Sequence, residues 1–289
     1  MSEHTGLELY TRTARASSAR VIRAYSNSFG LASRMLPAEV RAGIADVYAL
    51  ARVADEIVDG PAAEAGMDPV ATRALLDQFE SETVAALSRG FSANLTVHAF
   101  AATARATGID AGLVRPFFAS MRVDAGDVHL DLDGYRRYIH GSAEVVGSMC
   151  LRVFTLEDPA LVLDEEMEEG ARRLGAAFQK VNFLRDLADD SARLGRSYIP
   201  GVDPATITDA QKDTVVEDIA ADLDAARLAI GRLPAGSKRA TAAAAALFGR
   251  LNDQLRATPA DELRRRRVSV PTAVKLRLVA AAAMGRVGA

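Results

Sequence analysis

Apolar residues recur every three or four positions along most of this chain, which is the spacing of one face of an α-helix. Alanine is frequent, and no stretch alternates apolar and polar residues as a half-buried strand does. Glycine and proline divide the chain into segments long enough for helices of several turns. The main divisions fall at 60–61, 67–69, 108, 131–134, 158–159, 200–201, 234–236, 259 and 271. The pattern predicts one all-α domain over residues 1–289, with a core at about 20–280 and helices around a central cavity.

A helix predicted to begin after Pro37 carries its polar residues on one narrow stripe. The stripe consists of Tyr48, Arg52, Asp55 and Asp59, spaced four, three and four residues apart. The other faces of this helix are apolar, so we expect it to be buried and its polar stripe to line an internal cavity.

A second predicted helix repeats this design with Gln179, Asn182, Asp186 and Asp190, spaced three, four and four residues apart. Burying unpaired carboxylates costs several kcal/mol each, so two such stripes indicate a shared cationic ligand. Mg²⁺ binds carboxylate oxygens together with water and phosphate oxygens. The two stripes therefore predict Mg²⁺ ions that hold a diphosphate between two helices. The alternative is that both sets of charges lie on exposed helix faces.

The bulk composition narrows the class of protein. A net charge of −3 and a pI near 5.9 argue against a nucleic-acid-binding surface. Cys150 is the one cysteine, so an intrachain disulfide is excluded, and no Cys/His cluster suits zinc. The first residues lack the apolar core of a secretory signal, and no apolar run approaches the ~20 residues that span a bilayer. We therefore predict a cytoplasmic protein, with peripheral membrane contact as an open alternative.

Further motifs accompany the two stripes in a fixed order. The longest is the block 174–190, which contains Gln179-x-x-Asn182-x-x-Arg185-Asp186, and the others lie at 25–29, 48–59, 138–147 and 195–200. With this set, from about residue 26 to 275, the chain resembles the squalene/phytoene synthase family of head-to-head prenyl transferases. Within that family it is most similar to bacterial phytoene synthases of the actinobacterial type.

The resemblance implies an isoprenoid-synthase-type helical bundle and a reaction that depends on Mg²⁺ (Mn²⁺ as an alternative) but not on NADPH. Two identical prenyl diphosphates condense through a cyclopropyl diphosphate with release of diphosphate. The implied substrate is geranylgeranyl diphosphate and the implied product is phytoene, a carotenoid precursor. Three alternatives remain: a squalene or dehydrosqualene synthase that uses farnesyl diphosphate, a terpene cyclase, and a catalytically silent binding protein. The complete set of motif aspartates and the block 179–190 count against the last two.

The resemblance also implies roles for polar residues. The expected metal ligands, whose aspartates are also expected to be catalytic, are Asp55, Asp59, Asn182, Asp186 and Asp190. The expected substrate contacts are Arg52, Arg185, Arg196, Lys275, Gln179, Ser26, Ser28 and Phe29. Arginine matches phosphate oxygens with two donors, although the same arginines can instead form salt bridges with the motif carboxylates. The serines have helix N-capping as an equal alternative.

Aromatic and small residues complete the expected site. Tyr48 and Tyr138 are expected to face a carbocation, which a desolvated ring stabilises by up to ~2 kcal/mol; Tyr198 is a weaker candidate. The alternative for these tyrosines is a place in the core. Small tunnel-lining side chains leave room for long isoprenoid chains, and those expected here are Ser33, Ala143 and Gly147.

Two further features of the sequence bear on the site. Phe248 stands where many relatives of this family have tyrosine, so no hydroxyl is available there. The run of four arginines at 264–267 is expected to be a solvated face, with recruitment of anionic substrate or membrane headgroups as the alternative.

Overall fold

The fold consists of helices, apart from one isolated parallel bridge between His129 and Ser197, in the residues that the computed structural model describes: 5–26, 32–126, 128–187 and 197–284. This confirms the predicted all-α class. The elements in chain order are α1 (Gly6–Tyr25), η1 (Ser33–Met35), α3 (Ala38–Val58), α4 (Pro61–Glu64), α5 (Pro69–Arg89), α6 (Leu95–Thr107), α7 (Ala111–Asp124), α8 (Leu132–Ile139), η2 (His140–Glu144), α9 (Val145–Val153), η3 (Phe154–Leu156), α10 (Glu165–Arg185), α12 (Asp209–Arg232), α13 (Ala235–Ala257), α14 (Ala260–Leu263) and α15 (Thr272–Ala283).

Helix ends follow the capping residues and chain breakers of the sequence. α5 begins with Pro69 behind Asp68, whose carboxylate accepts a hydrogen bond from the Ala71 amide at 2.8 Å. The same helix ends at Gly90 in the left-handed conformation, which glycine adopts without a steric penalty. α3 begins one residue after Pro37, as the sequence predicts.

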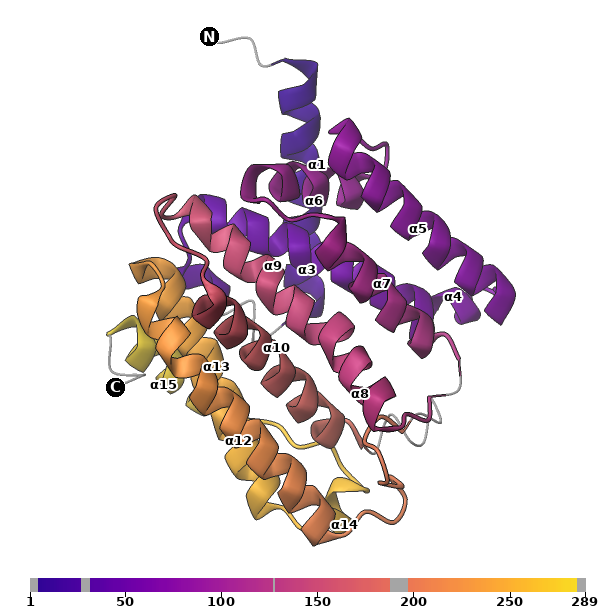
Figure 1. The fold of residues 1–289 in the computed structure, drawn as a ribbon, viewed down its shortest axis with the longest axis vertical. Helices are drawn as coiled ribbons and strands as arrows, with labels where there is room; N and C mark the ends of the chain where they lie inside the picture. Colours follow the sequence, from indigo (N-terminus) through magenta and orange to yellow (C-terminus); the bar gives the residue numbers. More distant parts are fainter. Residues whose placement is uncertain (1–4, 27–31, 127, 188–196, 285–289) are drawn as a thin grey trace.

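Helix α10 lies in the middle of the bundle, between α12 and α13 on one side and η2 and α9 on the other (Figure 1). Glycines allow the second of these contacts. A Cβ atom on Gly175 would lie 2.4 Å from the Ala143 carbonyl oxygen, and one on Gly147 would lie 2.2 Å from the Ala171 carbonyl oxygen. The helix backbones are therefore in direct contact, and a side chain at either glycine would push them apart.

Helices α8 and α9 form one continuous run because the π-helical turn η2 joins them. A π-helical turn contains one residue more than an α-helical turn and is frequent at functional sites. Gly141 in this turn lies against α7, where a Cβ atom would be 2.1 Å from the Ser120 hydroxyl oxygen. The next two residues, Ser142 and Ala143, line the central cavity.

Helix α3 is the second buried helix and packs against α1, α5, α6, α7 and α9. Its residues Val40, Ile44, Leu50 and Ala54 are at most 2 % exposed. One apolar cluster joins α3 to α5, α6, α7 and α9, and another joins α10 to α12, α13 and α14. Residues of both clusters line the central cavity.

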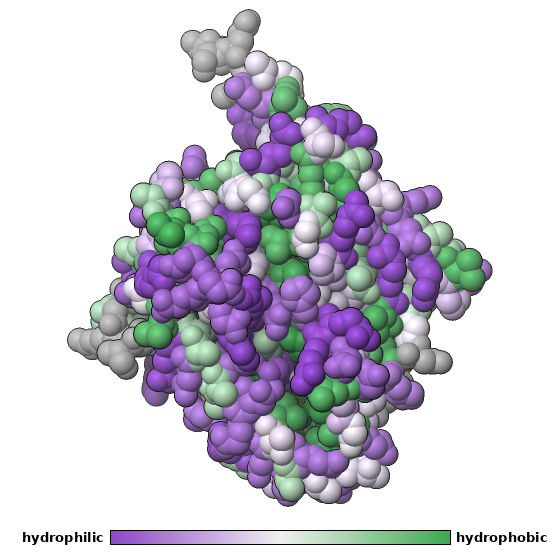
Figure 2. Space-filling model, viewed as in Figure 1, coloured by the Kyte–Doolittle hydropathy of each residue, from purple (hydrophilic) through white to green (hydrophobic). Residues whose placement is uncertain are grey.

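The surface seen in Figure 2 is largely hydrophilic, with hydrophobic residues in scattered patches. Scattered apolar residues of this kind are normal for globular proteins. Two exposed apolar side chains, Leu276 and Met284, lie in and just beyond α15. Within the described ranges, no helix combines the length and the apolar character needed to cross a membrane.

Candidate active site

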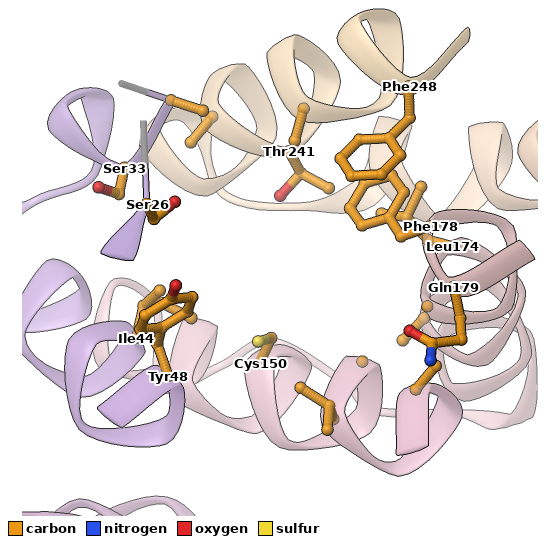
Figure 3. A pocket seen from close by; sticks show the side chains of 18 of the residues that line it. Ser26, Ser33, Ile44, Tyr48, Cys150, Leu174, Phe178, Gln179, Thr241 and Phe248 are labelled. Atoms are coloured by element: carbon orange, nitrogen blue, oxygen red, sulfur yellow. The ribbon is translucent and has the colours of Figure 1, made fainter. Parts of the chain in front are cut away.

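A cavity of about 710 Å³ lies among η1, α3, η2, α9, α10, α12, α13 and the segment that leads into α15 (Figure 3). Its volume falls within the ~300–1,000 Å³ typical of small-molecule sites. Much of the wall is apolar, with contributions from Leu36, Ile44, Leu151, Phe154 and Met167. The polar and charged side chains of the wall are Tyr25, Ser26, Ser33, Tyr48, Arg52, Ser142, Gln179, Asn182, Arg185, Thr241, Arg267, Ser269 and Lys275.

The charges of this wall all have one sign. Arg52, Arg185, Arg267 and Lys275 line the cavity, and no carboxylate does so among the residues that the structure describes. An apolar chamber with a cationic lining is complementary to a ligand that combines a hydrocarbon chain with an anionic group.

Tyr48 and Arg52 reach the cavity from α3, one helical turn apart. Burial raises the pKa of the Tyr48 phenol, and the side chains of Tyr48 and Ser26 hydrogen-bond each other. Arg52 forms an ion pair with Glu56, one turn further along, and its Cζ lies 4.5 Å from the centroid of the Tyr25 ring. Ser26 follows the last residue of α1 and is the C-cap of that helix. The alternative role of an N-cap stays a prediction, because residues 27–31 lie outside the described ranges.

Asp55 and Asp59 lie on the same helix but outside the cavity wall. Burial raises the pKa of Asp55 well above its usual value, and the negative charges of Asp59, Asp124 and Glu56 raise it further, against the opposing effect of Arg52. Asp59 is the C-cap of α3, and the last turn of this helix holds no basic residue. The negative end of a helix dipole therefore coincides with several carboxylates, which favours a bound cation at this point.

Asp124, the last residue of α7, is held by two buried tyrosines. The Tyr138 hydroxyl lies 2.9 and 2.8 Å from the two carboxylate oxygens, and the Tyr198 hydroxyl donates to one of them at 2.8 Å. Burial and the charge of Asp124 raise the pKa of Tyr138. Both tyrosines lie outside the cavity wall, where they fix a carboxylate that acts electrostatically on Asp55.

Asp186 caps the C-terminus of α10, which ends at Arg185. Arg185 donates to both carboxylate oxygens, from Nε at 2.9 Å and from Nη2 at 2.5 Å. Arg267 Nε lies 2.6 Å from Asp186 Oδ1. Helix α10 therefore ends before Asp186, and the pairing of Asp186 with Asp190 stays a prediction because Asp190 lies outside the described ranges. For Arg185, the salt bridge and a place in the cavity wall occur at once.

The arginine run divides into two parts. Arg264 and Arg265 form ion pairs with Asp261, and Arg266 with Glu262. These three arginines are partly or largely exposed, as the sequence predicts. Arg267 is 54 % exposed as well, but it also lines the cavity and contacts Asp186.

The small residues expected to line a tunnel do so, for more than one physical reason. Ser33 on η1 and Ala143 in η2 belong to the cavity wall and are buried. Gly147 also reaches the wall, but the space that its missing side chain leaves is taken by the Ala171 carbonyl oxygen. This glycine therefore serves helix packing as well as cavity volume.

Phe248 on α13 stacks on Phe178 of α10 across the cavity from Tyr48 (Figure 3). The ring centroids are 3.8 Å apart and the ring planes differ by 19°. Two flat apolar faces therefore join α10 to α13 at the wall, at a position where the resemblance leads one to expect a hydroxyl.

The structure brings most of the expected substrate contacts to the cavity. The expected residues found in its wall are Ser26, Ser33, Tyr48, Arg52, Ala143, Gly147, Gln179, Asn182, Arg185 and Lys275. The expected residues found outside the wall are Asp55, Asp59, Tyr138, Asp186 and Tyr198. Four expected residues lie outside the described ranges: Ser28, Phe29, Asp190 and Arg196. Within those ranges, no three His, Cys, Asp or Glu side chains are grouped as a metal site.

Sequence reasoning did not single out Tyr25, Ser142, Thr241, Arg267 or Ser269 as site residues, yet all five line the cavity. For Arg267 a signal was present, because the apolar segment after the arginine run enters the core with Val268 and Val270. Tyr25 and Ser142 lie inside the motif segments 25–29 and 138–147, which also carried a signal. Thr241 and Ser269 carry no pattern of their own, and only the packing of distant segments brings them to the cavity wall.

The geometry therefore defines a class of protein, namely helical proteins that hold an apolar cavity with a cationic lining. The family model for squalene/phytoene synthase matches residues 22–273. The chain is therefore a member of the squalene/phytoene synthase family.

Relatives of known sequence include a 15-cis-phytoene synthase from Paracoccus sp. (strain N81106 / MBIC 01143), 35 % identical over 184 residues, and a phytoene synthase from Arthrospira platensis, 30 % identical over 197 residues. These matches cover 61 % and 65 % of this chain, and the chain spans 56 % and 62 % of the length of the two relatives.

Solved structures share the fold. A dehydrosqualene synthase superposes with a TM-score of 0.77 at 20 % identity, covering 96 % of this chain and 98 % of the other. A squalene synthase from Alicyclobacillus acidocaldarius gives 0.73 at 22 % identity, with coverages of 86 % and 95 %. At these identities the similarity confirms the predicted isoprenoid-synthase-type bundle and extends no further than the fold.

Proposed function

We propose that this protein is a Mg²⁺-dependent phytoene synthase that condenses two molecules of geranylgeranyl diphosphate head to head. The observation that carries the proposal is the cavity wall, which is mainly apolar and holds four cations but no carboxylate among its described residues. Such a chamber suits an isoprenoid chain with a diphosphate head. The similarity to phytoene synthases from Paracoccus and Arthrospira supports the choice of substrate.

The metal ligands in this proposal remain those predicted from the sequence: Asp55, Asp59, Asn182, Asp186 and Asp190. The described members of this set fit a hard divalent cation, because all offer oxygen ligands and because like charges near Asp55 are unbalanced without one. Bound Mg²⁺ would neutralise the charge that develops on the leaving diphosphate.

The remaining polar residues of the wall would bind and orient the substrate. Arg52, Arg185, Arg267 and Lys275 offer donors to diphosphate oxygens from α3, α10 and the segment before and within α15. Tyr48 presents its ring to the cavity, where it would stabilise an allylic cation at its face. A hydrocarbon chain bound against the apolar wall would displace water from it, which would strengthen these charge interactions.

A dehydrosqualene or squalene synthase that uses farnesyl diphosphate is the second candidate. The Phe178–Phe248 stack favours it, because two rings on the wall reduce the room for a longer chain. The small Ser33 in the wall favours the longer substrate, because the resemblance to the family implies an aromatic side chain at this position in members that make shorter products. The proposal for geranylgeranyl diphosphate rests on Ser33 and on the phytoene synthase relatives together.

The deciding experiment is incubation of the purified full chain with Mg²⁺ and either geranylgeranyl or farnesyl diphosphate, without NADPH, followed by mass analysis of the hydrocarbon. We expect a forty-carbon product from the longer substrate and none in excess chelator. The matched variant Ser33→Phe should shift turnover toward the shorter substrate. A thirty-carbon product alone would establish the second candidate, and no product from either substrate would contradict both.

Peripheral membrane contact stays a prediction. Leu276 on α15 and Met284 just beyond its last residue are 53 % and 59 % exposed, and the exposed Arg277 follows Leu276 in sequence. Exposed apolar and basic side chains near the end of a helix are typical of contact with an anionic lipid surface. Co-sedimentation with anionic vesicles, lost in Leu276→Ser but kept in Leu228→Ser on α12, would be the expected outcome.

A further inference from the structure

Tyr25 lines the cavity from the last turn of α1 and is not among the site residues expected from the sequence. It is 51 % exposed, so it lies where the cavity opens to solvent. The Cζ atom of Arg52 lies 4.5 Å from the centroid of its ring. This is inside the ~6 Å within which a guanidinium is attracted to an aromatic face.

The other contacts of Arg52 leave part of its guanidinium group for a ligand. Nη2 forms the ion pair with Glu56 one turn further along α3. Nε is buried and has no hydrogen-bond partner among the residues that the structure describes. A buried donor without an acceptor is unfavourable, so its position indicates an acceptor other than the described residues.

The end of α1 contacts the polar stripe of α3 at two successive points. Tyr25 contacts Arg52, and the next residue, Ser26, hydrogen-bonds Tyr48, which lies one turn before Arg52. Two adjacent residues at the end of α1 therefore contact two residues of α3 that lie one helical turn apart, at i and i+4. This match fixes where the Tyr25 ring stands relative to Arg52.

The ion pair with Glu56 alone would not fix the orientation of the guanidinium plane, because a charge pair is only weakly directional compared with stacking. A ring against one flat face leaves the N–H edges of the guanidinium as the only directions for donation. The ring face, and not the tyrosine hydroxyl, makes this contact.

We propose that Tyr25 is a positioning residue for Arg52, and that its ring holds the guanidinium with the free Nε–H directed at a diphosphate oxygen in the cavity. This inference rests on the proposed function, because the acceptor is the diphosphate of that substrate. The phenyl ring is sufficient for this role, so phenylalanine should replace tyrosine and leucine should not.

The test compares Tyr25→Leu, Tyr25→Phe, Arg52→Gln and the double variant Tyr25→Leu/Arg52→Gln. Phe91→Leu is the matched control, because Phe91 is an aromatic residue 43 % exposed that contacts Tyr10 and His98 away from the cavity. The readouts are KM and kcat for geranylgeranyl diphosphate, the calorimetric affinity for inorganic diphosphate with Mg²⁺, and the thermal midpoint.

We expect Tyr25→Leu to raise KM about fivefold, with kcat changed less than ~2-fold and diphosphate affinity lowered by the same factor as KM. Tyr25→Phe and Phe91→Leu should match the wild type. In the Arg52→Gln background, Tyr25→Leu should have no further effect, because the group that it positions is gone. The thermal midpoints of the two Tyr25 variants should agree within ~2 °C, since the residue is exposed.

Two outcomes would overturn the inference: wild-type diphosphate affinity in Tyr25→Leu, or the same loss of affinity on Tyr25→Leu whether or not Arg52 is present. A failure of the proposed function would look different, because the wild type would then form no hydrocarbon from either prenyl diphosphate. The affinity for inorganic diphosphate would still test the contact between Tyr25 and Arg52 in that case, since it needs no turnover.

Discussion

The two aspartate motifs share one spacing in the sequence but have opposite electrostatic surroundings in the structure. Burial raises the pKa of Asp55, and the charges of Asp59, Asp124 and Glu56 raise it further against the opposing effect of Arg52. Asp186 instead contacts two cations, Arg185 and Arg267, at hydrogen-bonding distance. Spacing alone therefore does not set the charge balance of a carboxylate. The end of α3 has an excess of negative charge, whereas the carboxylate at the end of α10 is already compensated.

The helix ends explain much of this difference. Asp55 lies inside α3 and Asp59 caps it, whereas Asp186 is itself the cap of α10. A carboxylate at a helix C-terminus is unfavourable by ~0.3–1 kcal/mol because it meets the negative end of the dipole. At α10, two arginines offset this effect, and at α3 a bound cation would do so.

The largest effect should come from replacing either aspartate with its neutral amide. Asp55→Asn and Asp186→Asn should each lower kcat by ~10³-fold or more, because both carboxylates are proposed metal ligands. Thermal unfolding in excess chelator should separate them. Asp55→Asn should stabilise the metal-free protein by removing repulsion, and Asp186→Asn should destabilise it by leaving two arginines without their partner.

The exposed Asp224 provides the control for these variants, since its ion pair with Arg227 is 66 % and 74 % exposed on the two side chains. Asp224→Asn should change neither turnover nor the thermal midpoint. Stability shifts of the same sign in Asp55→Asn and Asp186→Asn would show that the contrast between the two motifs is wrong.

A third aspartate of α3 separates the effect of burial from the effect of like charges. Asp46 is fully buried, accepts a hydrogen bond from the Thr103 hydroxyl at 2.7 Å and lies 3.6 Å from Arg15 Nε. Burial raises its pKa to about 6, from 3.8 in an unfolded chain. The folded protein therefore binds the Asp46 proton more tightly than the unfolded chain does, so the contribution of this group to stability is fully present below pH 3.8 and is lost as the pH rises through about 6.

The expected loss of unfolding free energy from Asp46 is about 3 kcal/mol, since each pH unit between its unfolded and folded pKa contributes ~1.4 kcal/mol. Chemical denaturation of wild type and Asp46→Asn between pH 4 and 7 would measure it as the difference between the two curves. The difference should grow up to about pH 6 and then stay constant. Parallel curves would show that Asp46 is ionised in the folded protein over this whole range.

The smallest effect should come from Arg267, the cation that pairs with Asp186 from outside α10. Arg267→Gln should raise KM for the prenyl diphosphate about tenfold and leave stability within ~0.5 kcal/mol, because the side chain is 54 % exposed. Arg266→Gln is the matched control from the same run and should be neutral. Equal KM values for both variants would place Arg267 with its solvated neighbours.

The fold could be predicted from the sequence because hydrophobic spacing and chain breakers such as Pro37 determine the structure of neighbouring residues. The polar stripe on α3 could be predicted in part. Tyr48 and Arg52 line the cavity as expected, whereas Asp55 and Asp59 lie outside its wall. The role of Asp124 could not be predicted from the sequence, because it depends on hydrogen bonds from two tyrosines that come from distant segments.

The end of α10 shows a second limit of local reasoning. Carboxylates at i and i+4 read as one helical face, but the helix ends at Arg185 and Asp186 becomes its cap. This cap forms an ion pair with Arg267, which is distant in sequence. Periodicity predicts that a helix is present, but it does not predict the last residue of the helix or the tertiary contacts of its cap.

The π-helical turn η2 has a consequence for how this chain can change in length. A π-helical turn closes with one residue more than an α-helical turn, so the extra residue is taken up within the turn. Deleting one residue between His140 and Glu144 would let the turn close as an ordinary α-helix, and α9 would keep nearly the same face toward the cavity. Val146 and Cys150 would stay in the cavity wall, and Gly147 would keep its contact with the Ala171 carbonyl oxygen. A deletion within α9 has no such turn to absorb it and would rotate the residues that follow by ~100°.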